Sequence, residues 1–277
     1  MLRATEESIL GEAGNLFVRV WRPHSEPRAI AAICHGFNAH SGMYAWCGDQ
    51  FAQKGIAAYA LDLRGRGKSE GERFYVERFE DYVDDLSRLI NFAKSREPGL
   101  PVILLAHSAG GVTACLYALE HQSEIAALIC EDFAFEVPAP GFVLAVLKGI
   151  SHLAPHAPAL ALKNEDFSRD PRVVKAMNED PLIAHETQPF ATMAAIVRAD
   201  ERLKTAFSLI TLPVLIIHGT ADKAAKPSGS RHFYEHAGSK DRTLKFYEGR
   251  YHDPLSDLGK EEVFADILAW VETRLPS

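Results

Sequence analysis

Cysteine is scarce in this sequence, with four residues among 277. Cys34, Cys47, Cys115 and Cys130 are scattered, without the paired spacing of a zinc site and without enough cysteine for a disulfide framework. We interpret them as buried free thiols of a reducing compartment.

An excess of positive charge and long apolar runs are lacking too. Lysine and arginine total 30 against 37 acidic residues, which gives a net charge of -7 and no basic tract to neutralise phosphates. Nucleic acid is therefore excluded as a partner class.

No run approaches the roughly 18 to 20 apolar residues that span a bilayer, and residues 1–8 contain no apolar signal region. We expect a cytoplasmic enzyme.

What is present is enough apolar material for a large core, at 47% hydrophobic residues. Apolar runs at 29–34, 56–61 and 102–106 alternate with helical patterns near 44–54 and 79–95. This alternation predicts an α/β fold with a mostly parallel sheet covered by helices on both faces.

The regular alternation stops between residue 134 and about residue 209, where prolines recur between apolar helical pieces. An insertion at the carboxyl edge of a parallel sheet lies above whatever site that edge carries. The sequence therefore predicts a core of residues 1–134 and 206–277, with residues 135–205 forming a helical cap, or lid, over the active site.

Ser108 is the most informative residue, because Ala106-His107-Ser108-Ala109-Gly110 joins an apolar run to a helical pattern. This is the place of a nucleophile elbow, a sharp turn that needs small residues two positions either side of the serine. Gly110 satisfies that need, and Ala106 stands where glycine is usual. His107 is expected to pack beneath the turn.

A serine hydroxyl needs an imidazole to take its proton and a carboxylate to orient that imidazole. In the hydrolase fold that uses this elbow, the acid and then the histidine follow the serine along the chain. Asp222 follows the predicted strand 212–218, and His252 follows the short strand 244–247. We therefore assign Asp222 as the acid and His252 as the base. Asp132 is a rival acid, because it follows another predicted strand at 126–130.

Hydrolysis of an acyl bond also needs amide donors for the developing oxyanion. The residue after the nucleophile supplies one, the backbone amide of Ala109. The loop His35-Gly36-Phe37, which follows the strand 29–34, supplies the other through the amide of Phe37.

Together these motifs resemble the α/β-hydrolase superfamily, and within it the monoacylglycerol lipase group of serine hydrolases. The likeness extends to Tyr44 after His35-Gly36-Phe37, to the stretch 62–71 and to Asp180-Pro181-Leu182. The resemblance implies an α/β-hydrolase fold with a cap, no metal or organic cofactor, and hydrolysis of monoacylglycerols or related lipid-like esters to release a fatty acid.

The cap decides the substrate, since a serine, histidine and acid decide only the reaction type. Its apolar residues either line an acyl pocket or merely pack the cap onto the sheet; the candidates are Phe142, Leu144, Leu147, Leu160 and Leu162. Candidates for the polar end of a substrate are His40, expected at the surface, together with Tyr44 and Glu179. An exposed apolar cap helix would also allow transient contact with a membrane surface.

Other functions use the same residues. Lactonases, carbon–carbon bond hydrolases and acyltransferases all employ a serine, histidine and acid on this fold. A non-catalytic small-molecule-binding protein is the alternative from another class, although the presence of all three residues favours an enzyme. Ser108 at the nucleophile position disfavours a haloalkane dehalogenase, which needs a carboxylate there.

Overall fold

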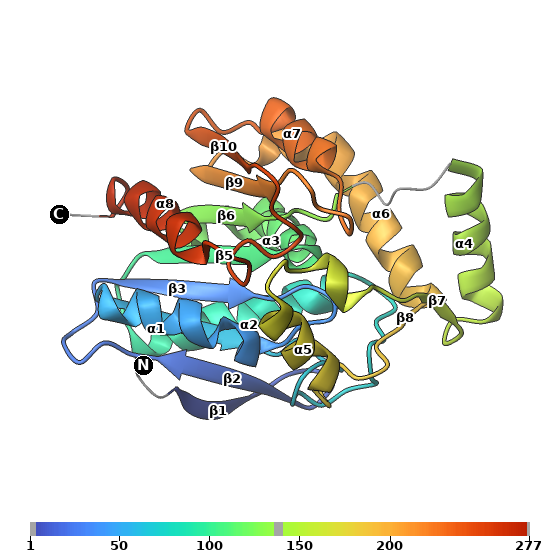
Figure 1. Ribbon diagram of the computed structural model, residues 1–277, viewed down its shortest axis with the longest axis horizontal. Coiled ribbons are helices and arrows are strands. Elements are labelled where there is room, and N and C mark those ends of the chain that lie inside the picture. Colours follow the sequence, from blue (N-terminus) through green and yellow to red (C-terminus); the bar gives the residue numbers. More distant parts are fainter. Residues whose placement is uncertain (1–3, 136–140, 276–277) are drawn as a thin grey trace.

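A mostly parallel sheet forms the centre of the computed structural model, which describes residues 4–135 and 141–275 (Figure 1). Its eight strands lie in the order β1-β2-β4-β3-β5-β6-β9-β10, and only the pairings of β2 with β1 and β4 are antiparallel. The strands are β1 (Thr5–Leu10), β2 (Asn15–Trp21), β3 (Ala29–Cys34), β4 (Ile56–Leu61), β5 (Val102–His107), β6 (Ala127–Glu131), β9 (Val214–Gly219) and β10 (Arg242–Tyr247).

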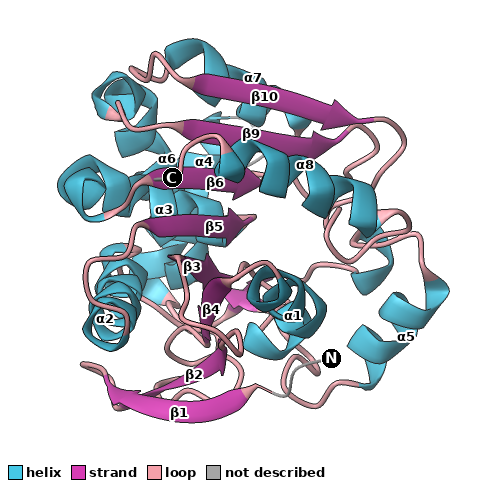
Figure 2. Cartoon of the chain, turned by 90° about the vertical axis from the view of Figure 1, so that its left-hand side faces the viewer, coloured by secondary structure: helices cyan, strands magenta, loops and turns pink. Residues whose placement is uncertain are grey.

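Helices cover both faces of this sheet (Figures 1 and 2). On one face lie α1 (Ala45–Gln53) and α8 (Lys260–Glu272), and on the other α2 (Glu80–Arg96), α3 (Ala109–His121) and α7 (Pro227–His236). Short 3₁₀ turns occupy η1 (Ser41–Tyr44), η2 (Gln122–Glu124) and η4 (Phe207–Leu209). The predicted doubly covered parallel sheet is confirmed.

The alternation of side chains along each strand explains the two layers. In β3, Ile30 and Ala32 join the core beneath α2 and α3, whereas Ala31 and Ile33 join the core beneath α1 and α8. Successive side chains of a strand point to opposite faces, so a strand apolar at every position must be buried on both. That is why these runs contain no polar alternation.

The segment between β6 and β9 forms a separate group of elements, called the insertion below. It contains α4 (Gly141–Leu153), β7 (Pro158–Leu160), η3 (Asn164–Asp166), α5 (Pro171–Glu179), β8 (Gln188–Pro189) and α6 (Phe190–Ala206). Figure 1 shows it at the carboxyl ends of the parallel strands, with α4 at the periphery beside α6. In the described part of the chain, no helix has the length and apolar character needed to cross a membrane.

Candidate active site

Ser108 lies at the turn between β5 and α3, with a φ of 55° and a ψ of -122°. This backbone region is unfavourable for a residue with a side chain, and close packing holds it in place. A Cβ atom on Gly110 would lie 2.5 Å from the carbonyl oxygens of Cys34 and His35, so only glycine fits there. Ala106 is fully buried in β5. The strained turn presents the serine hydroxyl at the carboxyl edge of the sheet.

His252 and Asp222 meet Ser108 from the loops after β10 and β9. His252 Nε2 lies 2.8 Å from Ser108 Oγ, and His252 Nδ1 lies 2.7 Å from Asp222 Oδ2. Ser108 and His252 are 4% and 1% exposed, so bulk water hardly competes for these bonds. The arrangement suits proton transfer from the hydroxyl to the imidazole, provided that Nδ1 carries the other proton.

The Asp222 carboxylate is held as an anion by two backbone N–H groups and by the side chains of His218 and His252. Its Oδ1 accepts the backbone N–H groups of Ala224 and Ala225 at 2.7 and 3.0 Å, and His218 Nε2 lies 3.0 Å from Oδ2. Burial alone would raise the pKa of Asp222, but the charge of His252 and the hydrogen bonds from both histidines outweigh it and lower that pKa well below its usual range.

The rival acid, Asp132, lies beside this group rather than in it. Its Oδ1 accepts the backbone N–H of Gly219 at 3.0 Å, and the carboxyl group is fully buried. Burial and the neighbouring charge of Asp222 raise the pKa of Asp132 well above its usual range, so the neutral form is favoured.

Asp132, Asp222 and His252 also lie close enough together to be a candidate set of metal ligands. One donor atom from each of Asp132, Asp222 and His252 falls within a group no wider than 4.8 Å. However, Asp222 and His252 already bond to each other, and the remaining nitrogen of His252 bonds to Ser108. Both ring nitrogens of His252 are therefore occupied by hydrogen bonds, which disfavours a metal centre here.

The two predicted oxyanion donors belong to chain segments that run side by side. A Cβ atom on Gly36 would lie 2.8 Å from Ser108 Cβ and 3.2 Å from the backbone nitrogen of Ala109. The turn containing Phe37 therefore passes directly against the start of α3. His35 fixes this turn, because its Nδ1 lies 2.7 Å from the carbonyl oxygen of Gly36 and its Nε2 accepts the N–H of Leu63 at 3.1 Å.

Other bonds fix the loop that carries His252. His107 Nε2 lies 2.8 Å from the carbonyl oxygen of His252, and burial lowers the pKa of His107 to about 4, which keeps it neutral. The backbone N–H groups of His252 and Asp253 donate to carbonyl oxygens of Asp166 and Phe167 in the insertion. The predicted packing role of His107 beneath the turn thus includes direct support of the histidine loop.

An apolar pocket opens at Ser108 and His252. Phe37 lines it from the turn after β3, and Ala134 and Phe135 line it from the segment after β6. Ala224 and Ala225 line it from the loop that carries Asp222. Four further residues come from the insertion, namely Leu160, Leu162, Met193 and Ile196. Met193 and Ile196 are one turn apart on α6 and were not anticipated, although the apolar run 193–197 signals a buried helix face there.

Several predicted substrate contacts do not line this pocket in the described part of the chain. Leu144 and Leu147 lie on α4, which contacts α6 at the periphery of the molecule (Figure 1), and Leu147 is partly buried and packs against the large core. Their role as substrate contacts stays a prediction. The side chain of Phe142 lies outside the described residues.

The three polar candidates are also elsewhere. His40 is 6% exposed rather than at the surface, and its Nε2 lies 2.8 Å from Asp180 Oδ2. Tyr44 is buried in η1, and burial raises its pKa well above the usual range. Glu179 is exposed at the end of α5, facing a different hollow of the surface. The assignment of these three residues to the polar end of a substrate stays a prediction.

Comparisons with known proteins agree on the family. The family model described as serine aminopeptidase S33 matches residues 25–259. The chain is 31% identical to a monoacylglycerol lipase of Mycolicibacterium smegmatis over 98% of both chains. It is 32% identical to the monoglyceride lipase of Homo sapiens, over 94% of this chain and 87% of that one.

A solved structure extends the likeness to three dimensions. The crystal structure of the monoacylglycerol lipase of Paleococcus ferrophilus matches with a TM-score of 0.83 at 28% identity, covering 94% of this chain and 99% of that one. The predicted α/β-hydrolase fold is therefore confirmed. The chain belongs to the serine aminopeptidase S33 family of α/β-hydrolases and is a monoacylglycerol lipase-like ester hydrolase.

Proposed function

We propose that this chain hydrolyses monoacylglycerols and related fatty-acid esters, with Ser108 as nucleophile, His252 as base and Asp222 as the acid that orients it. The observation that carries the proposal is the continuous chain of hydrogen bonds from Asp222 through His252 to Ser108, which ends at an apolar pocket. The names of the relatives supply the substrate class.

In the acylation step, His252 Nε2 takes the proton of Ser108 Oγ while that oxygen attacks the ester carbonyl. The new negative charge on the carbonyl oxygen is stabilised by the backbone amides of Phe37 and Ala109, each worth about 3 kcal/mol where such donors have been removed. His252 then gives the proton to the leaving alcohol, which departs as glycerol.

In the deacylation step, water replaces the alcohol. His252 takes a proton from the water, the hydroxide attacks the acyl-serine, and the proton returns to Ser108 Oγ as the fatty acid leaves. Asp222 keeps the proton of Nδ1 in place and offsets the positive charge on the ring in both steps. The buried, anionic state of Asp222 suits this role.

We further propose that residues 135–205 act as the cap that selects the acyl chain. Leu160, Leu162, Met193 and Ile196 come from this segment and face the same pocket as Ser108. Apolar surface without bonding groups favours an alkyl chain over a polar acyl group. The segment also binds the histidine loop through two backbone bonds, which ties cap and site together.

The test is hydrolysis of p-nitrophenyl esters of increasing chain length and of 1-monoacylglycerol, for wild type, Ser108→Ala and the exposed control Ser123→Ala. We expect turnover of both substrate types, loss in Ser108→Ala and no change in Ser123→Ala. Activity confined to short esters would favour an esterase or lactonase. Cleavage of aminoacyl p-nitroanilides instead of esters would contradict the proposal, and inactivity on all of them would favour a binding protein.

We also propose transient contact between α4 and a lipid surface. Val143, Val146 and Leu153 are 37%, 55% and 88% exposed and recur at intervals of three and seven residues, which places them on one face of the helix. Isolated exposed apolar residues are ordinary, but such a stripe favours an interface. A helix that delivers substrate directly from the membrane would explain why this face is left uncovered.

Co-sedimentation with neutral phosphatidylcholine vesicles tests this contact. We expect binding that is insensitive to salt, because the residues are apolar, and loss of binding in Val146→Ser/Leu153→Ser. The exposed leucine Leu209 lies in η4, so Leu209→Ser is the matched control and should bind as wild type does. Absence of wild-type binding would refute the contact and leave the ester hydrolase unaffected.

We propose a cytoplasmic location. The four cysteines are all free and buried. Few, buried cysteines without disulfide spacing are typical of a protein of a reducing compartment. Fractionation of the producing cells tests this location, and recovery of the protein with an extracytoplasmic fraction would overturn it.

A further inference from the structure

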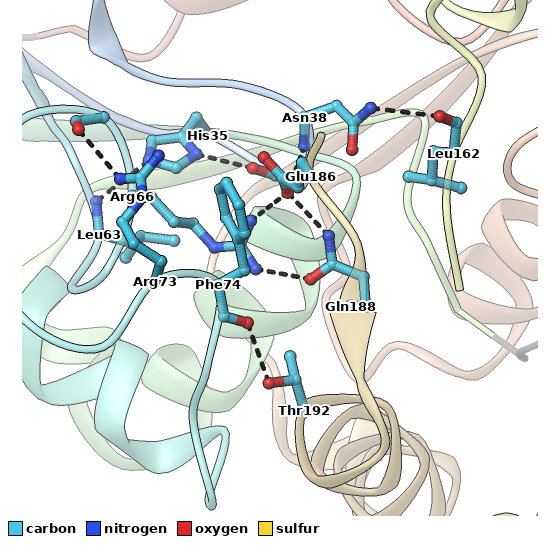
Figure 3. A network of polar contacts seen from close by, with 12 residues as sticks. His35, Asn38, Leu63, Arg66, Arg73, Phe74, Leu162, Glu186, Gln188 and Thr192 are labelled. Atoms are coloured by element: carbon cyan, nitrogen blue, oxygen red, sulfur yellow. Dashed lines mark hydrogen bonds and ion pairs between the residues drawn. The ribbon is translucent and has the colours of Figure 1, made fainter. Parts of the chain in front are cut away.

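A buried ion pair lies behind the turn that carries Phe37. Arg66 follows β4 and is 0% exposed, and Glu186 lies between α5 and α6 and is 5% exposed. Arg66 Nη1 donates to Glu186 Oε1, and Nη2 donates to Gln188 Oε1 at 2.8 Å (Figure 3). The pair therefore joins the loop after β4 to the insertion, 120 residues further along the chain.

Arg66 contacts Phe37 directly. Its guanidinium carbon lies 4.5 Å from the centre of the Phe37 ring, a cation–π distance. Its Nε donates to the hydroxyl of Tyr82 at 3.0 Å, so hydrogen bonds fix the guanidinium group that lies over the ring. The position of the Phe37 side chain therefore depends on the position of Arg66.

Glu186 holds the same turn through its backbone. Its Oε1 accepts the backbone N–H of Asn38 at 2.8 Å. Asn38 has a φ of 50°, in the left-handed region that costs energy for a residue with a side chain. Its side chain donates to Asn164 Oδ1, also in the insertion, at 3.0 Å. The carboxylate thus fixes the peptide group that follows Phe37, adjacent to the Phe37 amide.

Stability does not explain why a charged pair occupies this place. Replacing a buried ion pair by apolar residues of similar volume is often neutral or stabilising, so such a pair is weak ground for a structural role. Its bonds converge instead on one turn, with Arg66 on the ring of Phe37 and Glu186 on the next amide. The turn is one of the two that supply oxyanion donors in the proposed mechanism.

We propose that Arg66 and Glu186 are positioning residues for the oxyanion hole, acting through Phe37 and Asn38. This inference rests on the proposed function, in which the Phe37 amide is a donor. It makes the insertion part of the catalytic apparatus: the carboxylate that orients the Phe37–Asn38 peptide comes from the insertion, so the donor is in place only while the insertion is seated.

A matched pair of double variants isolates the contact. Single removal of Glu186 would leave a buried cation unpaired and destabilise the fold strongly. Arg66→Met/Glu186→Leu removes both charges and the acceptor for the Asn38 amide, whereas Arg66→Met/Glu186→Gln removes both charges and keeps an acceptor oxygen. Thermal unfolding midpoints establish that both variants are folded.

The assay compares p-nitrophenyl butanoate with its thiono analogue, in which sulfur replaces the carbonyl oxygen. Sulfur accepts hydrogen bonds poorly, so the thionoester gains little from the oxyanion hole. We expect Arg66→Met/Glu186→Leu to lose at least about tenfold in kcat on the ester, with KM and the thionoester rate much less affected. Arg66→Met/Glu186→Gln should recover the part of the ester preference that depends on the acceptor for the Asn38 amide, and the loss that remains measures the contact of Arg66 with Phe37.

The outcomes are separable. An unchanged ratio of ester to thionoester rates in both double variants would overturn the positioning role while leaving the ester hydrolase intact. An equal fall in both rates would mean a general structural defect and would also overturn it. Wild-type protein with no Ser108-dependent ester turnover would refute the proposed function, and this inference with it.

Discussion

Replacing Asp222 by asparagine tests how the base is oriented. In the structure Asp222 Oδ2 lies 2.7 Å from His252 Nδ1, and Oδ1 accepts two backbone N–H groups. An asparagine oxygen would keep those two bonds and turn its NH₂ group toward the ring. His252 would then carry its proton on Nε2, the nitrogen that must accept the proton of Ser108.

The expected loss is large because the wrong tautomer cannot act as the base. A serine hydrolase with the equivalent change loses about four orders of magnitude in kcat, which at 1.36 kcal/mol per decade is about 5 kcal/mol of transition-state stabilisation. The assay is the rate of p-nitrophenyl butanoate hydrolysis under saturating substrate, with a thermal unfolding midpoint to establish that the variant is folded.

Asp132→Asn is the control within the same cluster. Because burial and the charge of Asp222 raise the pKa of Asp132, an amide replaces a carboxyl group that is already neutral. We expect a change in kcat of less than about threefold, since the bond to the Gly219 amide is retained. Asp222→Asn with more than about a tenth of wild-type kcat, together with an inactive Asp132→Asn, would refute the assignment.

Three further predictions concern stability, the elbow and the pocket. Burial lowers the pKa of His107 from 6.5 to about 4, so the unfolded chain binds a proton that the folded protein does not, and stability is lost as pH falls through this window. The free energy of unfolding in urea should therefore drop between pH 7 and 5 by about 2 kcal/mol less in His107→Gln than in wild type; equal drops would contradict this. Gly110→Ala should abolish fluorophosphonate labelling, because its Cβ would meet two backbone carbonyls, whereas Gly149→Ala on α4 meets nothing within 4 Å and should label normally. Met193→Ala should move the optimum of an ester chain-length series toward longer chains, and Leu147→Ala should not; identical profiles would show that α6 does not bound the acyl site.

Most of the core strands, and the order of the loops that hold the site residues, could be predicted from local sequence patterns. The strands β3 and β4 fall where apolar runs predict them, because a strand that is buried on both faces must be apolar at nearly every position. Ser108, Asp222 and His252 could be picked out because each follows such a run, and the structure brings their side chains within hydrogen-bond distance.

The insertion was less predictable, for a physical reason. Helical spacing marks Leu144 as an apolar position of α4 but does not say whether a pocket or another helix lies beside α4; the structure places α6 against it. His40 has a polar side chain and was expected at the surface, yet Asp180 meets it from a distant segment. The bond between Arg66 and Glu186 likewise spans 120 residues, and neither flanking segment carries a local sign of it.

The position of the insertion has a consequence for the order of folding. Glu131 ends β6 and Val214 begins β9, and these neighbours in the sheet are separated by the whole insertion. Closing so long a loop costs conformational entropy before the contacts between β6 and β9 can form, and such non-local pairings form slowly. We expect β9 and β10 to dock late, which pulsed hydrogen exchange during refolding would detect as delayed protection of their amides. In a folding intermediate that precedes this step, Ser108 would already lie on the turn between β5 and α3, but His252 would not yet be placed beside it.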